Sequence, residues 1–257
     1  MIKHADVTAM AGPLEDVVTR ALEEARRQGA SSAEADASMS QGLSATARMG
    51  DVETIENNRD KSLSVSVYFG QRTGSASTTD MSPEAISKTV AAACSIASRT
   101  AEDDCGGLAD ADRMATEFPD LEIWHPWNPT AEQAIDIAMQ CEQAARDHDA
   151  RITNSEGATV SSHEGVGVYA NSHGFLGTRY GTRHSLSCAV IAGNDDGMER
   201  DYWYSIKRDR NNLEAAEDIG IKAAQRSVQR LGARKIKSCQ APVLFEAPVA
   251  SSLLGHL

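Results

Sequence analysis

The sequence predicts an α+β fold in which antiparallel sheets are flanked by helices. Apolar residues recur at helical spacing in four stretches of the chain, and in the stretches between them apolar and polar residues alternate with a period of two. The two patterns come in blocks, in the order α-β-β-β-β-α and then α-β-β-β-β-β-α. Blocks of this kind are typical of α+β proteins, and 257 residues suffice for one large domain or two small ones.

Four helices are expected from their apolar stripes and end signals. The first covers about 13–28, with Pro13 at the first helical position and Gly29 as the stop. The second begins after the N-cap Ser82 and ends near residue 100. The third begins at Thr130, which has capping-box spacing to Gln133, and the fourth covers about 213–231.

Strands are expected where the alternation is clearest. In the first block these are 33–39, 43–49, 63–69 and 75–79, and in the second block 152–154, 158–163, 166–171, 175–180 and 186–192. A further strand is expected over 198–205. The stretch 101–129 contains several Asp residues and three Pro, so we expect a long excursion over the surface that Trp124 and Trp127 hold in place.

The domain prediction divides the chain near its end. Residues 1–240 are expected to form one N-terminal α+β region, with two halves of similar layout, 1–128 and 129–240. Residues 241–257 are expected to begin a C-terminal domain, with a strand over 242–245 and a helix from Pro248. That helix has Val249, Leu253 and Leu254 on one side and no cap, so we expect the sequence to be truncated before a carboxy-terminal β-rich domain.

Charge and composition exclude several classes of function. The formal net charge is -12, which disfavours nucleic acids and anionic membrane surfaces as partners. No apolar run approaches the roughly 20 residues of a membrane span, and residues 1–12 lack the apolar core of a signal peptide. The five cysteines are widely spaced without a Cys-x-x-Cys pair, which favours reduced thiols and the cytoplasm.

The sequence contains no complete catalytic or metal-binding motif. His163-Glu164 opens like a zinc protease motif, but Gly165, Val166 and Gly167 follow without a second His. We therefore expect no catalytic residue and no metal ligand. A weaker alternative is a zinc site in which three histidines on neighbouring strands converge, namely His163, His173 and His184.

One aromatic segment is a candidate contact surface for a peptide or a partner. If 198–205 is a strand, Tyr202 and Tyr204 lie on one face and Trp203 on the other, next to Arg200. Tyr, Trp and Arg dominate binding hot spots. The plainer interpretation is an amphipathic edge strand.

Several segments together resemble one family. They are Gly-Asp-Val-Glu at 50–53, the stretch 63–80, Thr-Asn-Ser-Glu-Gly-Ala at 153–158, Ala-Asn-Ser-His-Gly-Phe at 170–175, Gly-Met-Glu-Arg-Asp-Tyr-Trp-Tyr-Ser at 197–205, Arg-Leu-Gly-Ala-Arg-Lys-Ile at 230–236, Ala-Pro-Val-Leu-Phe-Glu-Ala-Pro-Val at 241–249 and Leu-Leu-Gly-His at 253–256. In this order they resemble the PmbA/TldD family of peptidases and modulators of DNA gyrase, and the blocks at 198–202 and 230–234 look more like its PmbA (TldE) branch.

The resemblance implies a cytosolic metalloprotease built from a TldD-like and a PmbA-like chain, which degrades unfolded peptides and matures peptide precursors. The family's metal motif, His-Glu-x-x-x-His, belongs to the TldD-like chain. Residues 162–167 here, Ser-His-Glu-Gly-Val-Gly, lack its second His, so no catalytic or metal residue carries over. The resemblance therefore implies zinc in the partner chain and no cofactor in this one.

The leading functional hypothesis is a PmbA-like, non-catalytic subunit that acts with a TldD-like protease subunit on unfolded peptides. A peptide would pair with an exposed strand edge, and the stretch 158–192 would form the floor. Alternatives are a regulatory binding protein that modulates DNA gyrase without proteolysis, and a zinc enzyme complete in itself. A homodimer is a further option.

Overall fold

The structure is a computed structural model that describes residues 6–115, 119–195 and 197–256. The helices are α1 (Ala11–Arg27), α2 (Pro83–Ala97), α3 (Ala131–His148), α4 (Ala216–Gln229) and α5 (Ala247–Leu254), with short 3-10 turns at Val7–Met10, Ala111–Arg113 and Arg210–Asn212. The strands are β1 (Ser32–Arg48), β2 (Asp51–Phe69), β3 (Arg72–Thr78), β4 (Ile152–Asn171), β5 (Leu176–Asn194) and β6 (Gly197–Lys207). The α+β prediction is confirmed.

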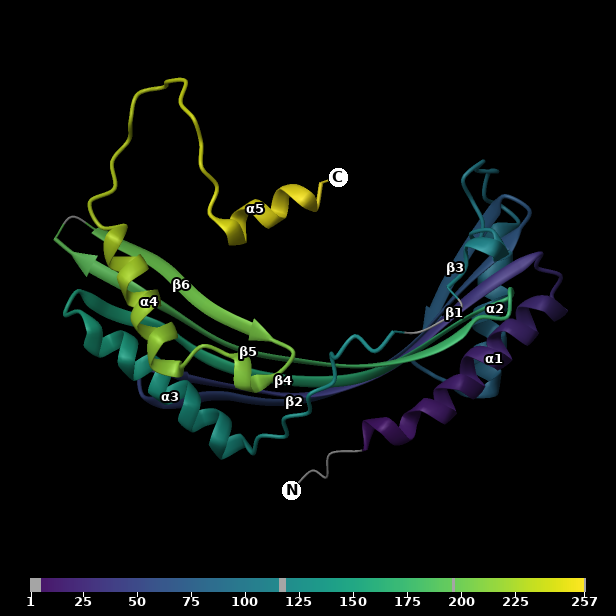
Figure 1. The fold of residues 1–257 in the computed structure, drawn as a ribbon, viewed down its shortest axis with the longest axis horizontal. Helices are drawn as coiled ribbons and strands as arrows, with labels where there is room; N and C mark the ends of the chain where they lie inside the picture. The colour runs from purple at the N-terminus through teal and green to yellow at the C-terminus, as the bar shows by residue number, and fades with distance from the viewer. Residues whose placement is uncertain (1–5, 116–118, 196, 257) are drawn as a thin grey trace.

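All six strands form one antiparallel sheet in the order β3-β2-β1-β4-β5-β6. Each block of the chain contributes a three-stranded meander, and the two meanders meet where β1 pairs with β4. The four longest strands extend across most of the molecule, and together they curve into a shallow bowl (Figure 1).

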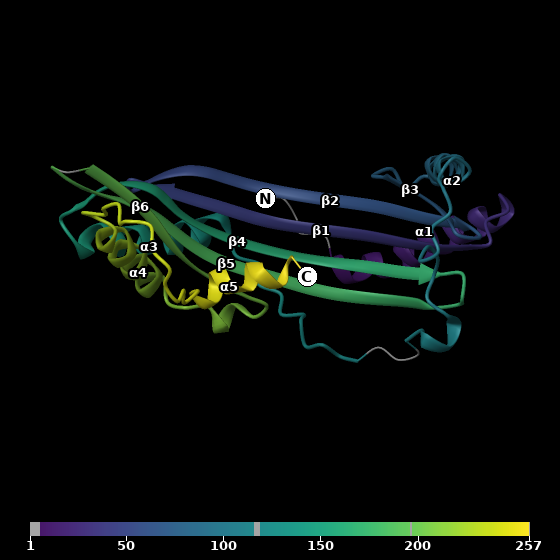
Figure 2. The same cartoon turned by 90° about the horizontal axis from the view of Figure 1, so that it is seen from above.

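The four large helices cover one face of this sheet. Along β1 the buried residues are Ala33, Ala35 and Ala37 near α1, then Leu43 and those that follow it near α3. Their positions all have the same parity, so they point to the same side of the strand. The α1–α2 pair lies at one end of the long strands and the α3–α4 pair at the other (Figures 1 and 2). The opposite face carries no helix packed against it among the described residues.

The covered face contains two separate apolar cores. The first packs α1 and α2 against one end of the sheet, around Leu14, Val65 and Ile86. The second packs α3 and α4 against the other end, around Val160, Leu186 and Ile219. Many of the core side chains are Ala or Val, which lets the helices approach the sheet closely.

A polar belt separates the two cores at the middle of the sheet. Gln41 donates to Glu164 (2.6 Å) there, and the buried His184 lies 3.0 Å from Ser162. The segment that precedes α3 crosses this belt. Its Trp124 packs on Tyr180 beside the first core, and Trp127 packs edge-on against His184 beside the second. The two indoles do hold the excursion in place, as predicted.

The strands are longer than the sequence pattern indicated. The two strands expected at 33–39 and 43–49 are one strand, β1, and the five expected over 152–192 are two, β4 and β5. Residues 51–62 of β2 were not expected to be a strand at all. Around residues 40–42 of β1 and 164–165 of β4 the apolar alternation stops at the polar belt, but the backbone pairing continues. Residues 51–62 of β2 are exposed throughout, so they show no apolar alternation although they pair with β1.

One further expectation needs correction. Residues 242–245 are not a strand, and the helix that follows, α5, has no buried residue. Within the stretch 158–192, β4 pairs with β1 on one side and β5 on the other, whereas residues 176–183 of β5 pair with β4 and with no described strand on their other side. A further open edge lies on β2, since β3 pairs only with its Leu63–Phe69 part. No helix in the described part of the chain is long and apolar enough to cross a membrane.

Candidate functional site

The uncovered face of the sheet is lined by small hydroxyl side chains that bond across the strands. Ser38 bonds with Ser62 (3.0 Å), Thr46 with Thr159 (2.9 Å), Ser44 with Ser161 (2.8 Å) and Ser66 with Ser75 (2.9 Å). Short polar side chains leave the backbone of the long strands close to the surface. This face therefore has few bulky side chains and is polar and rich in groups that can donate or accept hydrogen bonds.

At the middle of this face a shallow trough crosses the strands. Its floor is one row of paired residues, Gly181 on β5, Gly165 on β4 and Ser40 on β1. The two glycines have no side chain and the serine is small, so the row lies lower than its neighbours. The hollow that includes it has a volume of about 360 Å³.

Arginines form the walls of the trough at its β5 end. Arg179 precedes Gly181 by two residues and Arg183 follows it by two, so both side chains rise on the same face of the sheet. The guanidinium of Arg179 lies across Gly167, where an added Cβ would meet its Nε at 3.2 Å, and Asp36 pairs with it at 3.5 Å. Arg208 approaches from beyond the end of β6, and its Nη1 donates to the carbonyl of Thr182 (2.8 Å).

His163 stands beside Arg183 in the wall. Its ring lies over Gly42, where an added Cβ would come within 2.0 Å of Nδ1, so Gly42 is required for this position of the ring. Burial lowers the pKa of His163, and the charges of Arg183 and His184 lower that pKa further. The imidazole is therefore held toward its neutral form, as a hydrogen-bonding group at the rim.

The structure does not bring the three predicted histidines together. His163 and His184 belong to neighbouring strands, but they lie on opposite faces, since His163 pairs with Arg183 and His184 pairs with Ser162. His184 is fully buried, with Nε2 2.9 Å from the carbonyl oxygen of His125. His173 lies in the turn between β4 and β5, 10 residues along β4 from His163. Among the described residues no group of three or more His, Cys, Asp or Glu is placed to hold a metal ion.

The residues of the aromatic segment lie on alternate faces of β6, as expected for a strand. Tyr202 and Tyr204 stack on the uncovered face with ring centroids 6.0 Å apart, and Arg200 lies over Tyr202 while bonding to Glu156. Trp203 points to the other face. There the Nζ of Lys222 lies 3.5 Å from the centroid of the Trp203 ring, so Trp203 attaches α4 to the sheet, while its ring centroid remains 6.2 Å from that of Tyr204.

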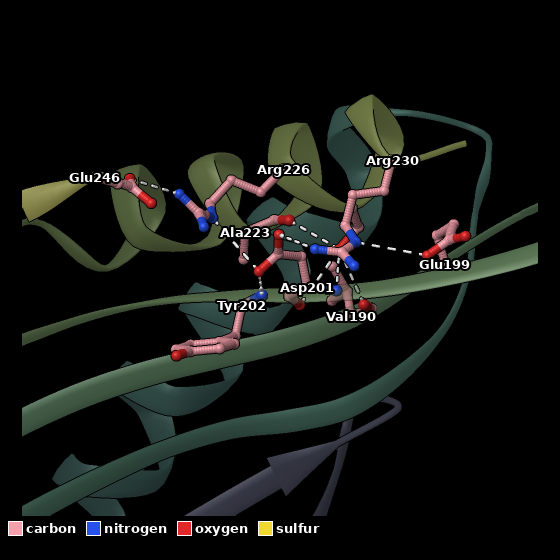
Figure 3. A network of polar contacts seen from close by, with 9 residues as sticks. Val190, Glu199, Asp201, Tyr202, Ala223, Arg226, Arg230 and Glu246 are labelled. Atoms are coloured by element: carbon pink, nitrogen blue, oxygen red, sulfur yellow. Dashed lines mark hydrogen bonds and ion pairs between the residues drawn. The ribbon is translucent and has the colours of Figure 1, made fainter. Parts of the chain in front are cut away.

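A polar network next to Trp203 explains why Asp201 is buried (Figure 3). The Asp201 carboxylate forms ion pairs with Nε of Arg226 (3.4 Å) in α4 and with Nη1 of Arg230 (3.6 Å) at the C-terminal end of that helix. Arg226 also pairs with Glu246 (2.9 Å), which is the main polar tie between α4 and the segment leading to α5. The buried Ser227 hydroxyl lies 3.0 Å from the carbonyl oxygens of Val190 and Ala223, and it accepts from the backbone N–H of Asp201. The network is structural and joins α4, β5 and β6.

The two buried cysteines are not placed to act as nucleophiles. Cys141 and Cys188 are both buried in the second core. A hydrogen bond with Cys188, together with burial, raises the pKa of Cys141 far above its usual range. Cys105 and Cys239 are exposed and free.

Two family models match this chain. Residues 33–97 match the model described as PmbA/TldA metallopeptidase domain 1, and residues 124–231 match the PmbA/TldA metallopeptidase central domain. The chain is 45 % identical over 253 residues to the metalloprotease PmbA of Escherichia coli O157:H7. This chain belongs to the PmbA/TldD family, in its PmbA branch. The resemblance stated from the motifs is confirmed.

Other relatives agree with this placement in the PmbA/TldD family. A metalloprotease PmbA homolog of Haemophilus influenzae is 44 % identical over 243 residues, 95 % of this chain. A crystal structure of a proposed modulator of DNA gyrase from Bacteroides thetaiotaomicron has a TM-score of 0.79 at 24 % identity, over 89 % of this chain and 52 % of that one, and shows the fold alone. The alignments cover 98 % of this chain but 56 % of the E. coli protein, so the chain spans about half the length of the curated relatives it matches.

The trough was missed by the sequence analysis, although a signal for it exists. Residues 179–183 read Arg-Tyr-Gly-Thr-Arg, so two arginines and a glycine occupy alternate positions of a strand. In a strand those three residues share one face. The pattern becomes meaningful once the register shows Gly165 opposite Gly181.

Proposed function

We propose that this chain is the peptide-holding subunit of a PmbA/TldD-type metalloprotease and that a TldD-like chain supplies the metal. The observation that carries the proposal is the 45 % identity to a metalloprotease PmbA along nearly the whole chain, joined to a sheet whose one face is uncovered and polar. In this proposal the zinc and the hydrolytic step belong to the partner, while this chain binds and orients the peptide.

The geometry around residues 162–167 supports a role without metal for this half of the protein. His163 and Glu164 are adjacent on β4, so they point to opposite faces of the sheet, and Glu164 accepts from Gln41 on the covered face. Residues 165–167 contribute no second His, so this strand does not present two imidazoles on one side. The donor set of the described residues does not fit a zinc ion.

Two features of the sheet suit an unfolded peptide. The first is the open edge of β2 at residues 51–62, whose backbone groups can extend the antiparallel sheet by one strand. Acidic residues along it, such as Glu53 and Asp60, discourage the pairing of two copies. The second is the uncovered face, which offers hydroxyl groups and the exposed Tyr202–Tyr204 stack. Backbone pairing gives affinity with little sequence preference, as degradation of unfolded peptides requires.

The test is reconstitution of the two-chain enzyme. The full-length protein is purified with and without a TldD-like chain, and hydrolysis of an unfolded peptide and bound zinc are measured for each. We expect hydrolysis only from the pair, with zinc in the partner. An Ile55→Lys substitution, which adds a charge to the open β2 edge, is expected to raise KM for peptide, while Ile96→Lys at an equally exposed isoleucine of α2 serves as the matched control.

Hydrolysis and stoichiometric zinc in this protein alone would refute the proposal. The competing assignment, modulation of DNA gyrase without proteolysis, predicts a different result. In that case immobilised protein retains gyrase and fails to retain the TldD-like chain, and the pair shows no hydrolysis above either chain alone.

A further inference from the structure

We propose that the central trough is a carboxylate-binding subsite for peptides, in which Arg183, Arg208 and Arg179 hold the anionic group over the Gly165–Gly181 floor. The inference rests on the proposed peptide-holding function and adds to it a preferred chemical group and a position. It is carried by the arrangement of residues across three rows of the sheet.

The rows define the shape of the subsite. Running from β5 to β2, the middle row is Gly181, Gly165, Ser40 and Asp60. The rows on either side begin with Arg179 and Arg183. Successive residues on one face of a strand are about 7 Å apart, so the two arginines lie about 13 Å apart across a floor that has no side chain at its β5 end. A carboxylate resting on that floor is within reach of both guanidinium groups.

The charge along the trough is unequal at its two ends. The β5 end carries Arg179, Arg183 and Arg208, with Asp36 as the one carboxylate that pairs with them among the described ion pairs. Asp60 lies at the β2 end, three strands away, or about 14 Å at the usual strand spacing. The protein as a whole has a net charge of -12, so this cluster of cations is a local exception that attracts anions to one place.

Donor geometry favours a carboxylate over other groups. Guanidinium groups present parallel N–H donors that match the two oxygens of a carboxylate. Arg208 is fixed by its bond to the Thr182 carbonyl, and Arg179 is fixed across Gly167 and by Asp36. Arg183 is exposed, and its guanidinium has no hydrogen bond or ion pair with the described residues, so its side chain can close over a ligand. The imidazole of His163, seated over Gly42, completes the rim.

The glycine floor allows a clean test by substitution. An added Cβ at Gly181 meets nothing closer than Nη1 of Arg208 at 3.7 Å, so a side chain fits there without moving the backbone. Gly181→Glu therefore fills the floor and places a negative charge among the arginines. Gly181→Ala changes the backbone in the same way with little filling, and serves as the matched control. At Gly165 the Met39 carbonyl lies at 3.1 Å from an added Cβ, so that position is unsuitable.

The experiment measures peptide binding directly by fluorescence anisotropy, with the full chain and three peptides labelled at the N-terminus. The peptides share one Gly-Ser-Ala sequence: the first has a free C-terminal carboxylate, the second a C-terminal amide, and the third an amide with one internal Glu. We expect the free acid to bind about tenfold more tightly than the amide, and Arg183→Gln or Gly181→Glu to remove most of that difference. Arg99→Gln, at an exposed arginine just after the end of α2, is expected to leave the difference unchanged.

The outcomes distinguish a C-terminal carboxylate from a side-chain carboxylate, and they distinguish failure of the subsite from failure of the proposed protease role. If the peptide with the internal Glu also binds tightly and loses affinity in Arg183→Gln, the subsite takes side-chain carboxylates as well, which supports the inference. Equal affinity for acid and amide, or no effect of either variant, overturns it. Circular dichroism melts of Gly181→Glu and Gly181→Ala exclude unfolding as the cause. Peptide hydrolysis by the two-chain enzyme is measured separately, so loss of the subsite and loss of the protease role are distinguishable.

Discussion

Substitution of Gly220 by Ala tests the close crossing of α3 and α4. A Cβ at Gly220 would lie 2.1 Å from the carbonyl oxygen of Cys141 and 3.0 Å from the backbone nitrogen of Ala145. Both are backbone atoms, so no side-chain rotation can relieve the clash. The helices must separate by about 1 Å, which forfeits a quarter to a half of the dispersion energy of each contact between them.

The expected cost follows from that displacement. Overpacking of this kind costs about 1–3 kcal/mol, and the higher helix propensity of Ala returns at most about 1 kcal/mol of it. We therefore expect Gly220→Ala to lower the free energy of unfolding by about 2 kcal/mol and Tm by about 4–8 °C for a chain of this size. The matched control is Gly12→Ala in α1, where no atom lies within 4 Å of the added Cβ and a small gain is expected.

The assay is urea and thermal denaturation followed by circular dichroism, with tryptophan fluorescence as a second probe. Trp127 and Trp203 both pack against the second core, so a loosened α3–α4 pair changes their emission before global unfolding. If Gly220→Ala proves as stable as the parent, or if both glycine substitutions shift Tm in the same direction, the close-crossing argument is refuted.

Three further predictions concern polar groups. Glu142 is buried and accepts from the backbone N–H groups of Met49 (2.7 Å) and Gly50 (2.9 Å), so Glu142→Gln is expected to cost about 2 kcal/mol in urea denaturation, while Asp136→Asn on the exposed side of the same helix costs little. Ser227→Ala removes the hydroxyl that joins α4 to β5 and β6 and is expected to lower the free energy of unfolding by about 1–2 kcal/mol; an unchanged unfolding midpoint would contradict this role. Because the pKa of His163 is lowered in the folded state, the unfolded chain takes up its proton first, and stability is lost as pH falls below the ordinary value of 6.5. His163→Gln is expected to flatten that dependence in thermal melts between pH 7.5 and pH 5, and Arg183→Gln to raise the pKa of His163 as followed by NMR.

The helices and the ends of the sheet could be predicted because one side of each is buried. The apolar stripe on residues 13–28 reflects the core that this helix faces, and α1 lies within two residues of the predicted range. The capping box predicted at Thr130 is present, and α3 begins at the next residue. The alternation at 33–37 and 186–190 is equally direct, because those residues pack under a helix.

The middle of the sheet could not be predicted by the same reasoning. There β1 has Ser40 and Gly42, and β4 has Gly165 and Gly167, so short polar residues and glycines replace the apolar side chains. Such residues are typical of turns, so the sequence pattern predicts separate strands on either side of them. Their actual role is to keep one face of continuous strands free of bulk, which is visible only when the register of neighbouring strands is known.

The candidate site was out of reach for a related reason. Arg179, Arg183 and Arg208 are ordinary exposed arginines in the sequence, and their grouping depends on which strands are neighbours and where β6 stops. The separation of Tyr202 and Tyr204 from Trp203, by contrast, needed only the period of a strand, and the structure has the arrangement that this period predicts.

Each of the two apolar cores contains residues from both blocks of the chain. The first is completed by Val166, Val168 and Ala170 from the second block, and the second by Leu43, Ala45 and Ala47 from the first. A chain severed between α2 and α3 would give two fragments, each lacking a strand end that its own helices need. Neither fragment can bury its apolar surface alone, but each contains the strand end that the other lacks. The two pieces are therefore expected to reassemble by complementation when mixed, and to be captured by chaperones when expressed apart.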